Sequence, residues 1–175
     1  EQYDKLFFIT QNSILNQNSI VTTIIQIGYH YICSDNEKCK SLKEYEKIIK
    51  FLSSNHCNKN SVIISIGGGT VTDLCGFVSS SYMRGIAHIA VPTTLLGMVD
   101  AAIGGKTALN VGQIRNLIGS YKNPESIIIY NKFNNYNNTF TFTFVHISCV
   151  ESAFNLQYQV WPRSVEVRMC VLIHF

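Results

Sequence analysis

The residues that decide the fold are Ser61 to Asp73, with the sequence SVIISIGGGTVTD. Ser61 to Ile66 is a run of apolar and β-branched residues without polar alternation, which predicts a strand covered on both faces, as in a parallel sheet. Three glycines, Gly67 to Gly69, follow at once, and a helix is predicted from about Val71 to Met83. A strand, a glycine turn and a helix in this order are typical of an α/β domain.

The glycine turn is a candidate phosphate site. Glycine permits positive φ and lets the backbone approach a ligand without an intervening Cβ atom. The unpaired N–H groups and the positive end of the following helix suit a pyrophosphate. The dinucleotide fingerprint G-x-G-x-x-G is not completed, however. Three glycines alone are therefore about equally consistent with a tight turn that binds nothing.

Neighbouring segments continue the alternation of strands and helices along the chain. Further strands are expected at Leu6 to Thr10, Ser19 to Ile27, Ile86 to Val91 and Ser126 to Tyr130, and helices at Ser41 to Leu52 and Thr93 to Val99. The segment Ser19 to Ile27 is also compatible with the end of a helix. In Ser41 to Leu52, apolar residues recur at spacings of three and four, which defines one helix face. Alternating strands and helices predict an α/β domain.

The composition fits a globular domain and argues against several other classes. Hydrophobic residues make up 46% and charged residues 14% of the chain, unlike the composition of disordered proteins. The net charge of +3 is spread along the sequence, so no nucleic-acid partner is expected. No membrane segment is expected either, because no stretch reaches the roughly 18–20 apolar residues needed to cross a bilayer. No signal peptide is recognisable. The six cysteines form no C-x-x-C pair, which favours free buried thiols.

The character of the chain changes after Tyr130. Asn131 to Asn138 is rich in asparagine, and Thr139 to Phe175 has no sustained helical period and no known motif. We therefore expect an α/β domain at residues 1–130 and a foreign or poorly ordered tail at residues 131–175.

Two further motifs lie where a ligand could bind. Pro92-Thr93-Thr94-Leu95-Leu96 follows a strand, and its hydroxyls can bind a nucleotide or cap a helix, with capping the stronger expectation for this motif alone. In Asp100 to Thr107 (DAAIGGKT), the P-loop pattern fails because Asp100 occupies the position of its first glycine. The carboxylate of Asp100 and the ammonium of Lys106 can hold a polyhydroxylated, phosphorylated compound or form a surface ion pair.

Two cations complete the set of candidates. Arg84 stands in YMRG and Arg115 precedes Asn116 in RNLIG. Taken singly, each is expected to be a surface residue. In order and spacing, however, the motifs from Gly67 to Gly119 together resemble 3-dehydroquinate synthase.

The resemblance covers roughly Leu6 to Tyr130, and Asp35 to Ser41 is similar to that family's acidic-Gly-Glu-x-x-Lys segment. It implies a Rossmann-like, parallel-sheet domain that binds NAD, followed in the family by a helical domain with a zinc site. The family converts 3-deoxy-D-arabino-heptulosonate 7-phosphate to 3-dehydroquinate with loss of phosphate, in the shikimate pathway. NAD transiently oxidises a ring hydroxyl and is regenerated. The resemblance also implies a cytoplasmic enzyme and allows a homodimer.

The resemblance assigns a role to each matching residue. The expected cofactor-binding residues are Glu37, Lys40, Gly68, Gly69, Thr70, Asp73, Thr93, Thr94, Leu96, Asp100, Ala101, Lys106 and Arg115. The expected substrate-binding residues are Asp100, Lys106, Asn116 and Arg84, where Arg84 holds the phosphate from its own or a neighbouring subunit.

The sequence departs from the family in several places. Ala101 stands where many members have Ser, Arg115 replaces the usual Lys, and Gln11 lies about where a nucleotide-binding Asp or Asn is expected. No residue after Tyr130 matches the family's zinc ligands, one Glu and two His, or its helical domain. We therefore expect no metal site and no activity from this chain alone.

Three alternatives remain open. One is another sugar-phosphate cyclase, such as an enzyme acting on sedoheptulose 7-phosphate. The second is an iron-containing alcohol dehydrogenase, which shares a Gly-Gly-Gly-x-x-x-Asp segment, although Asp100 to Lys106 argues against it. The third is a noncatalytic, truncated NAD-binding module.

Overall fold

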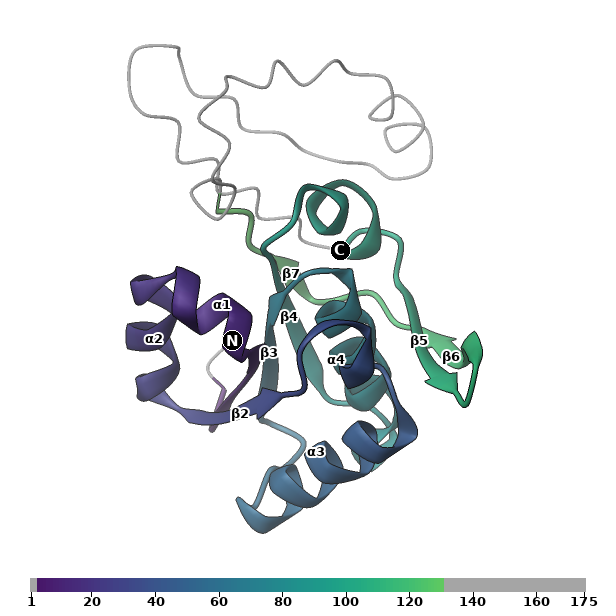
Figure 1. The fold of residues 1–175 in the computed structure, drawn as a ribbon. Helices are drawn as coiled ribbons and strands as arrows, with labels where there is room; N and C mark the ends of the chain where they lie inside the picture. Colours follow the sequence, from purple (N-terminus) through teal and green to yellow (C-terminus); the bar gives the residue numbers. More distant parts are fainter. Residues whose placement is uncertain (1–2, 131–175) are drawn as a thin grey trace, which may run out of the picture.

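A five-stranded parallel sheet forms the centre of the molecule (Figure 1). The structure, a computed structural model, describes residues 3–130, so the predicted tail at 131–175 lies outside the described residues. The strand order is β2-β1-β3-β4-β7. These strands are β1 (Leu6–Gln11), β2 (Tyr29–Cys33), β3 (Val62–Gly67), β4 (Ala87–Pro92) and β7 (Ser126–Ile127). The predicted parallel α/β domain is confirmed.

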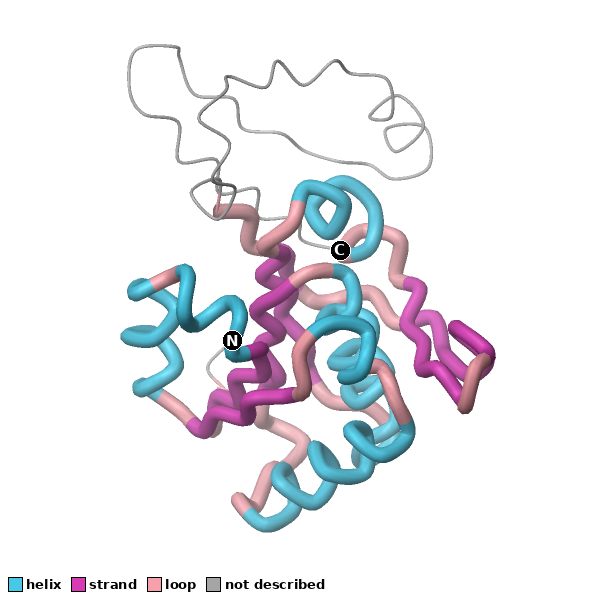
Figure 2. The backbone as a smooth tube through the Cα atoms, in the orientation of Figure 1, coloured by secondary structure: helices cyan, strands magenta, loops and turns pink. Residues whose placement is uncertain are grey.

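Helices cover both faces of this sheet (Figure 2). On one side lie α1 (Asn12–Gln17), α2 (Ser19–Ile24) and the short helix η1 (Ile25–Ile27), and on the other lie α3 (Leu42–Ser54) and α4 (Gly69–Ser81). Successive side chains of a strand point to opposite faces. Phe7 and Ile9 of β1 therefore pack with the residues of α3 and α4, whereas Phe8 packs with Val21 and Ile25.

The strand, glycine turn and helix predicted between Ser61 and Met83 form in the structure. β3 is followed by the glycine turn, and α4 begins at Gly69. A Cβ atom on Gly67 would lie 2.6 Å from Cγ2 of Val71. The first turn of α4 can pack this closely on the end of β3 only because residue 67 is glycine.

The second predicted helix is also confirmed. Ser41 caps α3 by accepting a hydrogen bond from the backbone N–H of Glu44, at 3.3 Å. Ile48 and Leu52 are fully buried on its inner face. The N-cap hydroxyl and the apolar stripe explain why the helix begins and packs where the sequence indicates.

The predicted strand at Ser19 to Ile27 is wrong. These residues form α2 and η1, and the second strand of the sheet begins only at Tyr29. Val21 and Ile25 are buried, whereas Ile20 and Ile24 are 47% and 40% exposed. Spacings of four residues place each pair on one helix face, so packing overrides the β-propensity of the β-branched side chains.

The segment after β4 begins with a short π-helix, η4 (Gly97–Ala101), which starts later than the helix predicted from Thr93. A two-stranded antiparallel sheet follows, made of β5 (Lys106–Val111) and β6 (Ile114–Tyr121), which we call the β5–β6 hairpin. It packs against α4 (Figure 1). This hairpin was not among the elements predicted from the sequence.

The topology locates the edge at which a ligand would bind. β2 and β3 lie on opposite sides of β1, so the connections leave β1 and β3 in different directions. In open parallel sheets, ligands bind at such a switch point, outside the carboxyl ends of the strands. Here these ends are Gln11 and Gly67, and Pro92 ends the next strand.

Candidate functional site

The glycine turn lies directly against the segment that follows β4. A Cβ atom on Gly68 would be 3.1 Å from Cγ2 of Thr94, and one on Gly69 would be 3.2 Å from Cβ of Ala101. Both contacts are tighter than ordinary van der Waals contact. Glycine at these two positions is therefore what allows the segment after β4 to lie this close to the start of α4. The N-terminus of that helix offers the unpaired N–H groups that suit a pyrophosphate.

The two threonines of this segment play different parts. Oγ1 of Thr94 accepts a hydrogen bond from the backbone N–H of Gly97 at 3.1 Å, so it caps the helical turn as the motif predicts. Thr93 is 7% exposed. Its N–H donates to the carbonyl of Gly67 at 2.9 Å, but its Oγ1 has no hydrogen-bond partner among residues 3–130. A buried hydroxyl without a partner is unfavourable unless a ligand supplies one.

Charged residues from three elements gather beside the glycine turn. Lys40, which follows the short helix η2 (Asn36–Cys39), is buried and forms an ion pair with Asp73 of α4. Burial raises the pKa of Asp73, although the Lys40 ammonium opposes this, and the nearby carboxylates of Glu37 and Asp100 raise it further. Three carboxylates and one ammonium thus share this end of the sheet.

Asp100 and Ala101 belong to the π-helix η4, whose wide turn is closed by the N–H of Ala102 donating to the carbonyl of Gly97 at 3.0 Å. π-turns of this kind occur frequently at functional sites. Asp100 is exposed, and Leu96, just before η4, is 68% exposed. Both side chains are therefore accessible to a ligand in the structure.

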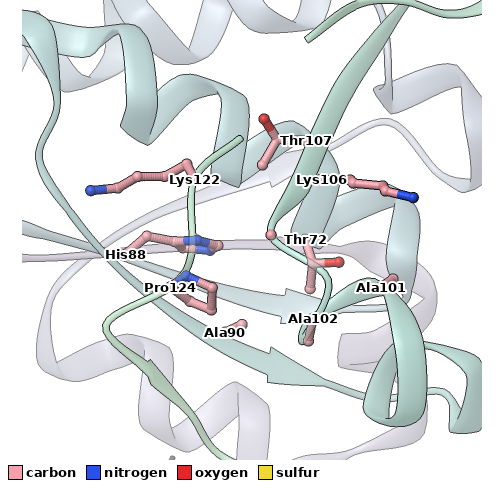
Figure 3. A pocket seen from close by; sticks show the side chains of 10 residues that line it. Thr72, His88, Ala90, Ala101, Ala102, Lys106, Thr107, Lys122 and Pro124 are labelled. Atoms are coloured by element: carbon pink, nitrogen blue, oxygen red, sulfur yellow. The ribbon is translucent and has the colours of Figure 1, made fainter. Parts of the chain in front are cut away.

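Lys106 begins β5 and is exposed. It is one of the residues that line a cavity of about 10 Å³, together with Thr72, His88, Ala90, Ala101, Ala102, Gly105, Thr107, Lys122 and Pro124 (Figure 3). The Lys106 side chain points away from His88 in this view. Burial lowers the pKa of His88 to about 3, so its ring, which hydrogen-bonds Oγ of Ser65 at 2.9 Å, is neutral. The cavity has room for about one water molecule and is too small for a sugar phosphate.

Arg115 and Asn116 lie in a bulge of the β5–β6 hairpin. Leu109 pairs with Ile118, and Val111 pairs with Ile114, so Asn110 alone faces the three residues 115–117. Asn116 has φ of 53°, in the left-handed region that asparagine tolerates better than most residues. The bulge places both residues on the exposed side of the hairpin.

Asn110 joins this bulge to the charged cluster and was not identified from the sequence. Its Nδ2 donates to Oε1 of Glu37 at 2.8 Å, and its Oδ1 accepts from the N–H of Asn116 at 2.9 Å. Glu37 and Asn110 are 73 residues apart. No local pattern signals such a contact, because it depends on the way the hairpin folds back over α4.

Gln11, at the carboxyl end of β1, turns toward the protein. Its Nε2 donates to the carbonyls of Ser34 and Asn36, at 2.9 and 3.2 Å. Asn36 has φ of 58° and stands where the similar family segment has Gly. Gln11 thus fixes the backbone that leads to Glu37 and Lys40.

Arg84 does not join the other candidates. It precedes β4 and follows α4, whereas the glycine turn follows β3 and precedes α4. The 13 residues of α4 separate the two ends by roughly 20 Å at about 1.5 Å per residue. Arg84 instead lines a surface hollow of about 640 Å³ together with Lys59 and Lys122. The structure therefore separates Arg84 from the other candidates of the same chain, and its expected role in binding phosphate, from its own or a neighbouring subunit, stays a prediction.

Four cysteines, Cys33, Cys39, Cys57 and Cys75, are free and buried, as expected for those positions. Within the described part of the chain, no three His, Cys, Asp or Glu side chains are grouped so that they could hold a metal ion. The helices between residues 3 and 130 are too short or too polar to cross a bilayer.

Comparison with known proteins identifies the family. Residues 30–140 match the 3-dehydroquinate synthase N-terminal family. The 3-dehydroquinate synthase of Clostridium tetani is 42% identical over 130 residues, which cover 74% of this chain and 34% of the relative. That of Sulfurisphaera tokodaii is 50% identical over 94 residues, which cover 54% and 27%. The chain thus spans about a third or less of the length of these relatives.

Solved structures agree on the fold. A 2-deoxy-scyllo-inosose synthase complexed with carbaglucose-6-phosphate, NAD+ and Co2+ has a TM-score of 0.65 at 24% identity, covering 75% of this chain and 37% of that one. An iron-containing alcohol dehydrogenase from Thermotoga maritima has a TM-score of 0.59 at 12% identity, covering 75% and 41%. At these identities the likeness shows the fold alone, which is the predicted Rossmann-like, parallel-sheet α/β domain. Because the family match covers more than half of the 175 residues, the chain belongs to the 3-dehydroquinate synthase N-terminal family.

Proposed function

We propose that this chain is the nucleotide-binding part of a 3-dehydroquinate synthase. The whole protein would convert 3-deoxy-D-arabino-heptulosonate 7-phosphate to 3-dehydroquinate with loss of phosphate. The observation that carries the proposal is the cradle at the carboxyl edge of the sheet, where Gly68 and Gly69 lie against Thr94 and Ala101 and the buried hydroxyl of Thr93 lacks a partner among residues 3–130. The curated relatives named 3-dehydroquinate synthase support the reaction class.

The residues of this cradle fit NAD. The backbone of Gly68 and Gly69 and the start of α4, with Thr70, would bind the pyrophosphate. The Thr93 hydroxyl would donate to the nucleotide, with Thr94 and Leu96 beside it. NAD would supply reversible removal of hydride from a ring carbon of the substrate. Carboxylates at the cradle accept hydrogen bonds from ribose hydroxyls and repel a 2′-phosphate, which favours NAD over NADP.

The charged residues around the cradle would divide the remaining tasks. Glu37 and Asp73 would accept from ribose hydroxyls, and Lys40 would keep Asp73 oriented through their ion pair. Asp100 would contact the nicotinamide ribose and the substrate hydroxyls. Lys106 would hold an anionic group of the substrate, and Asn116 would bind it through its carboxamide. Arg115 would add positive charge near the nucleotide.

Arg84 would serve a second copy of the chain. Because α4 separates it from its own cradle by roughly 20 Å, we propose that it holds the substrate phosphate in the site of a neighbouring subunit. This proposal requires a homodimer. A mixed dimer with an Arg84→Ala site in one subunit and an Asp100→Ala site in the other would regain up to half of the activity if Arg84 acts across the interface.

Metal chemistry lies outside the residues described. The side chains of residues 3–130 offer no group of ligands for zinc, so any metal would be bound by other parts of the whole protein. We propose two parts for the chain, residues 1–130 as the nucleotide-binding domain and residues 131–175 as a separate segment. The free thiols of Cys33, Cys39, Cys57 and Cys75 support a reducing compartment such as the cytoplasm.

The reaction is tested by turnover of the whole protein that contains this chain. With NAD and a divalent metal present, it is expected to release phosphate from 3-deoxy-D-arabino-heptulosonate 7-phosphate and to form 3-dehydroquinate. Cyclisation of sedoheptulose 7-phosphate instead would identify another sugar-phosphate cyclase. Net formation of NADH from an alcohol would identify an alcohol dehydrogenase, and NAD binding without any turnover would identify a noncatalytic module.

A further inference from the structure

Asn110 makes three hydrogen bonds that connect two separate parts of the proposed site. Its backbone N–H donates to the carbonyl of Lys40 at 2.8 Å. Its side-chain Nδ2 donates to Oε1 of Glu37 at 2.8 Å, and its Oδ1 accepts from the N–H of Asn116 at 2.9 Å. Glu37 and Lys40 belong to the proposed nucleotide end, and Asn116 belongs to the proposed substrate end.

The carboxamide is the group that this position requires. Glu37 presents a carboxylate oxygen, which needs a donor, and the backbone of Asn116 presents an N–H, which needs an acceptor. An Asn side chain carries an NH2 group that donates and a carbonyl oxygen that accepts, both on the same rigid plane. Asp at position 110 would keep the acceptor but repel Glu37, and Leu would lose both interactions. The pair of contacts is therefore a bridge and not two independent hydrogen bonds.

The Asn116 end of the bridge is the end that needs support. Asn116 has positive φ, and it lies in the bulge where regular pairing between β5 and β6 is interrupted. Residues 112–119 are exposed, so packing contributes little to fixing this turn. The hydrogen bond from its N–H to Asn110 is consequently a large part of what determines the direction of the Asn116 side chain.

We propose that Asn110 is a positioning residue that couples the nucleotide end of the site to the substrate end. A nucleotide that binds Glu37 and Lys40 fixes the Glu37 carboxylate. Glu37 then holds the carboxamide of Asn110 in one orientation, and the carboxamide in turn orders the backbone of Asn116. By linkage, a ligand held by Asn116 tightens nucleotide binding by the same factor. This inference rests on the proposed function, because it takes NAD as the nucleotide.

The experiment measures hydrogen exchange of the backbone amide of Asn116 by NMR in the full 175-residue chain, with and without saturating NAD. NAD is expected to slow this exchange roughly 3- to 10-fold, the range of a partly exposed hydrogen bond. In Asn110→Asp, the backbone amide of Asn116 is expected to exchange as slowly as in the wild type without NAD. Addition of NAD to this variant is expected to slow the exchange no further. In Asn110→Leu the amide is expected to exchange faster in both conditions.

Two controls separate coupling from general destabilisation. Gln113→Glu adds a carboxylate to the same hairpin, at an exposed position outside the bridge, and is expected to keep the wild-type response to NAD. The amide of Leu109, which is fully buried in β5, reports whether each variant is folded. A variant that changes Asn116 but not Leu109 has lost the bridge alone.

The outcomes distinguish the inference from the proposal beneath it. If NAD binds the wild-type chain but leaves Asn116 exchange unchanged, the coupling is wrong and the NAD site stands. An undiminished response to NAD in Asn110→Asp would overturn the coupling in the same way. If the wild-type chain binds no NAD at all, the proposed function fails first.

Discussion

Lys40 and Asp73 form an ion pair between the end of η2 and the first turns of α4, with side chains that are 6% and 20% exposed. Burial nevertheless raises the pKa of Asp73 above its ordinary value of 3.8, because the ammonium beside it does not fully offset the loss of solvent and the nearby carboxylates Glu37 and Asp100. The ionised carboxylate is thus kept in a position that disfavours its charge. Groups held in this way are concentrated at functional sites.

Replacement of Asp73 by Asn is expected to leave the free energy of unfolding at pH 7 equal to or above that of the wild type, while weakening NAD binding roughly 10-fold. A folded-state pKa above the unfolded value means that the folded protein binds the proton more tightly. The contribution of Asp73 to stability is therefore full below pH 3.8 and is lost as pH rises through the folded pKa. Denaturant unfolding between pH 4 and 7 measures the difference.

The comparison variant for Asp73→Asn is Glu46→Gln, which removes an exposed carboxylate from the i,i+4 pair with Lys50. It is expected to leave NAD binding unchanged and to affect stability only slightly, and in the opposite sense to Asp73, because the pairing with Lys50 lowers the pKa of Glu46. A large loss of stability in Asp73→Asn at pH 7, without weaker NAD binding, would show that the ion pair serves the fold alone.

Thr93→Val and Thr94→Val are expected to change the free energy of unfolding in opposite directions. Thr93→Val removes a buried hydroxyl without a partner among residues 3–130, so it should raise stability by up to about 1 kcal/mol and weaken NAD binding roughly 10-fold. Thr94→Val removes the cap on Gly97 and should lower stability by about 1 kcal/mol. Thermal unfolding and NAD titration measure both effects. Unchanged NAD affinity in Thr93→Val would remove this hydroxyl from the site.

Glu44→Gln is expected to lower stability by about 1–3 kcal/mol at pH 7. Glu44 is buried and accepts from the Tyr31 hydroxyl at 2.9 Å, from Ser34 and from Lys47. Burial alone would raise the pKa of Glu44, but these donors outweigh it and hold the pKa below 4.5. The difference between wild type and variant should therefore persist above pH 4.5 and shrink as pH falls through the folded pKa. A pH-independent difference would contradict this assignment.

Gly119→Ala is expected to separate the two strands of the β5–β6 hairpin, whereas Gly112→Ala is expected to leave them paired. A Cβ atom at Gly119 would lie 2.1 Å from the carbonyl oxygen of Thr107, so the two strands would have to separate. Gly112 has φ of +60° but nothing within 4 Å of its Cβ position, so alanine there should cost only about 1 kcal/mol. Proteolysis of the hairpin reports the result, and equal resistance in both variants would contradict the packing.

The sequence predicted the elements in which local pattern and tertiary packing agree. The continuous apolar run of β3 and the capped, three-and-four spacing of α3 each have one good structural solution. The prediction of a strand at Ser19 to Ile27 failed because the β-branched residues of this segment fit a strand locally. The residues that reach the core are Val21 and Ile25, and their spacing of four is that of a helix. β-propensity is decided by what the side chain packs against.

The parts of the candidate site could be predicted from the sequence, but the contacts that connect them could not. The glycine turn, Thr93 and Asp73 each belong to a motif that can be read locally. The bridge through Asn110 could not be predicted in this way. It joins Asn110 to Glu37, 73 positions away, and it depends on a hairpin that no local sequence pattern indicates. The position of Arg84 at the opposite end of α4 also follows from topology and not from spacing.

Binding of NAD by this chain is the property on which the proposed function most directly depends. Titration calorimetry of the 175-residue chain with NAD, and separately with NADP, is the decisive measurement. We expect saturable binding of one NAD per chain and binding of NADP at least roughly 10-fold weaker, because its 2′-phosphate meets the carboxylates around Glu37 and Asp73. No detectable binding of NAD at millimolar concentration, or a preference for NADP, would contradict the account.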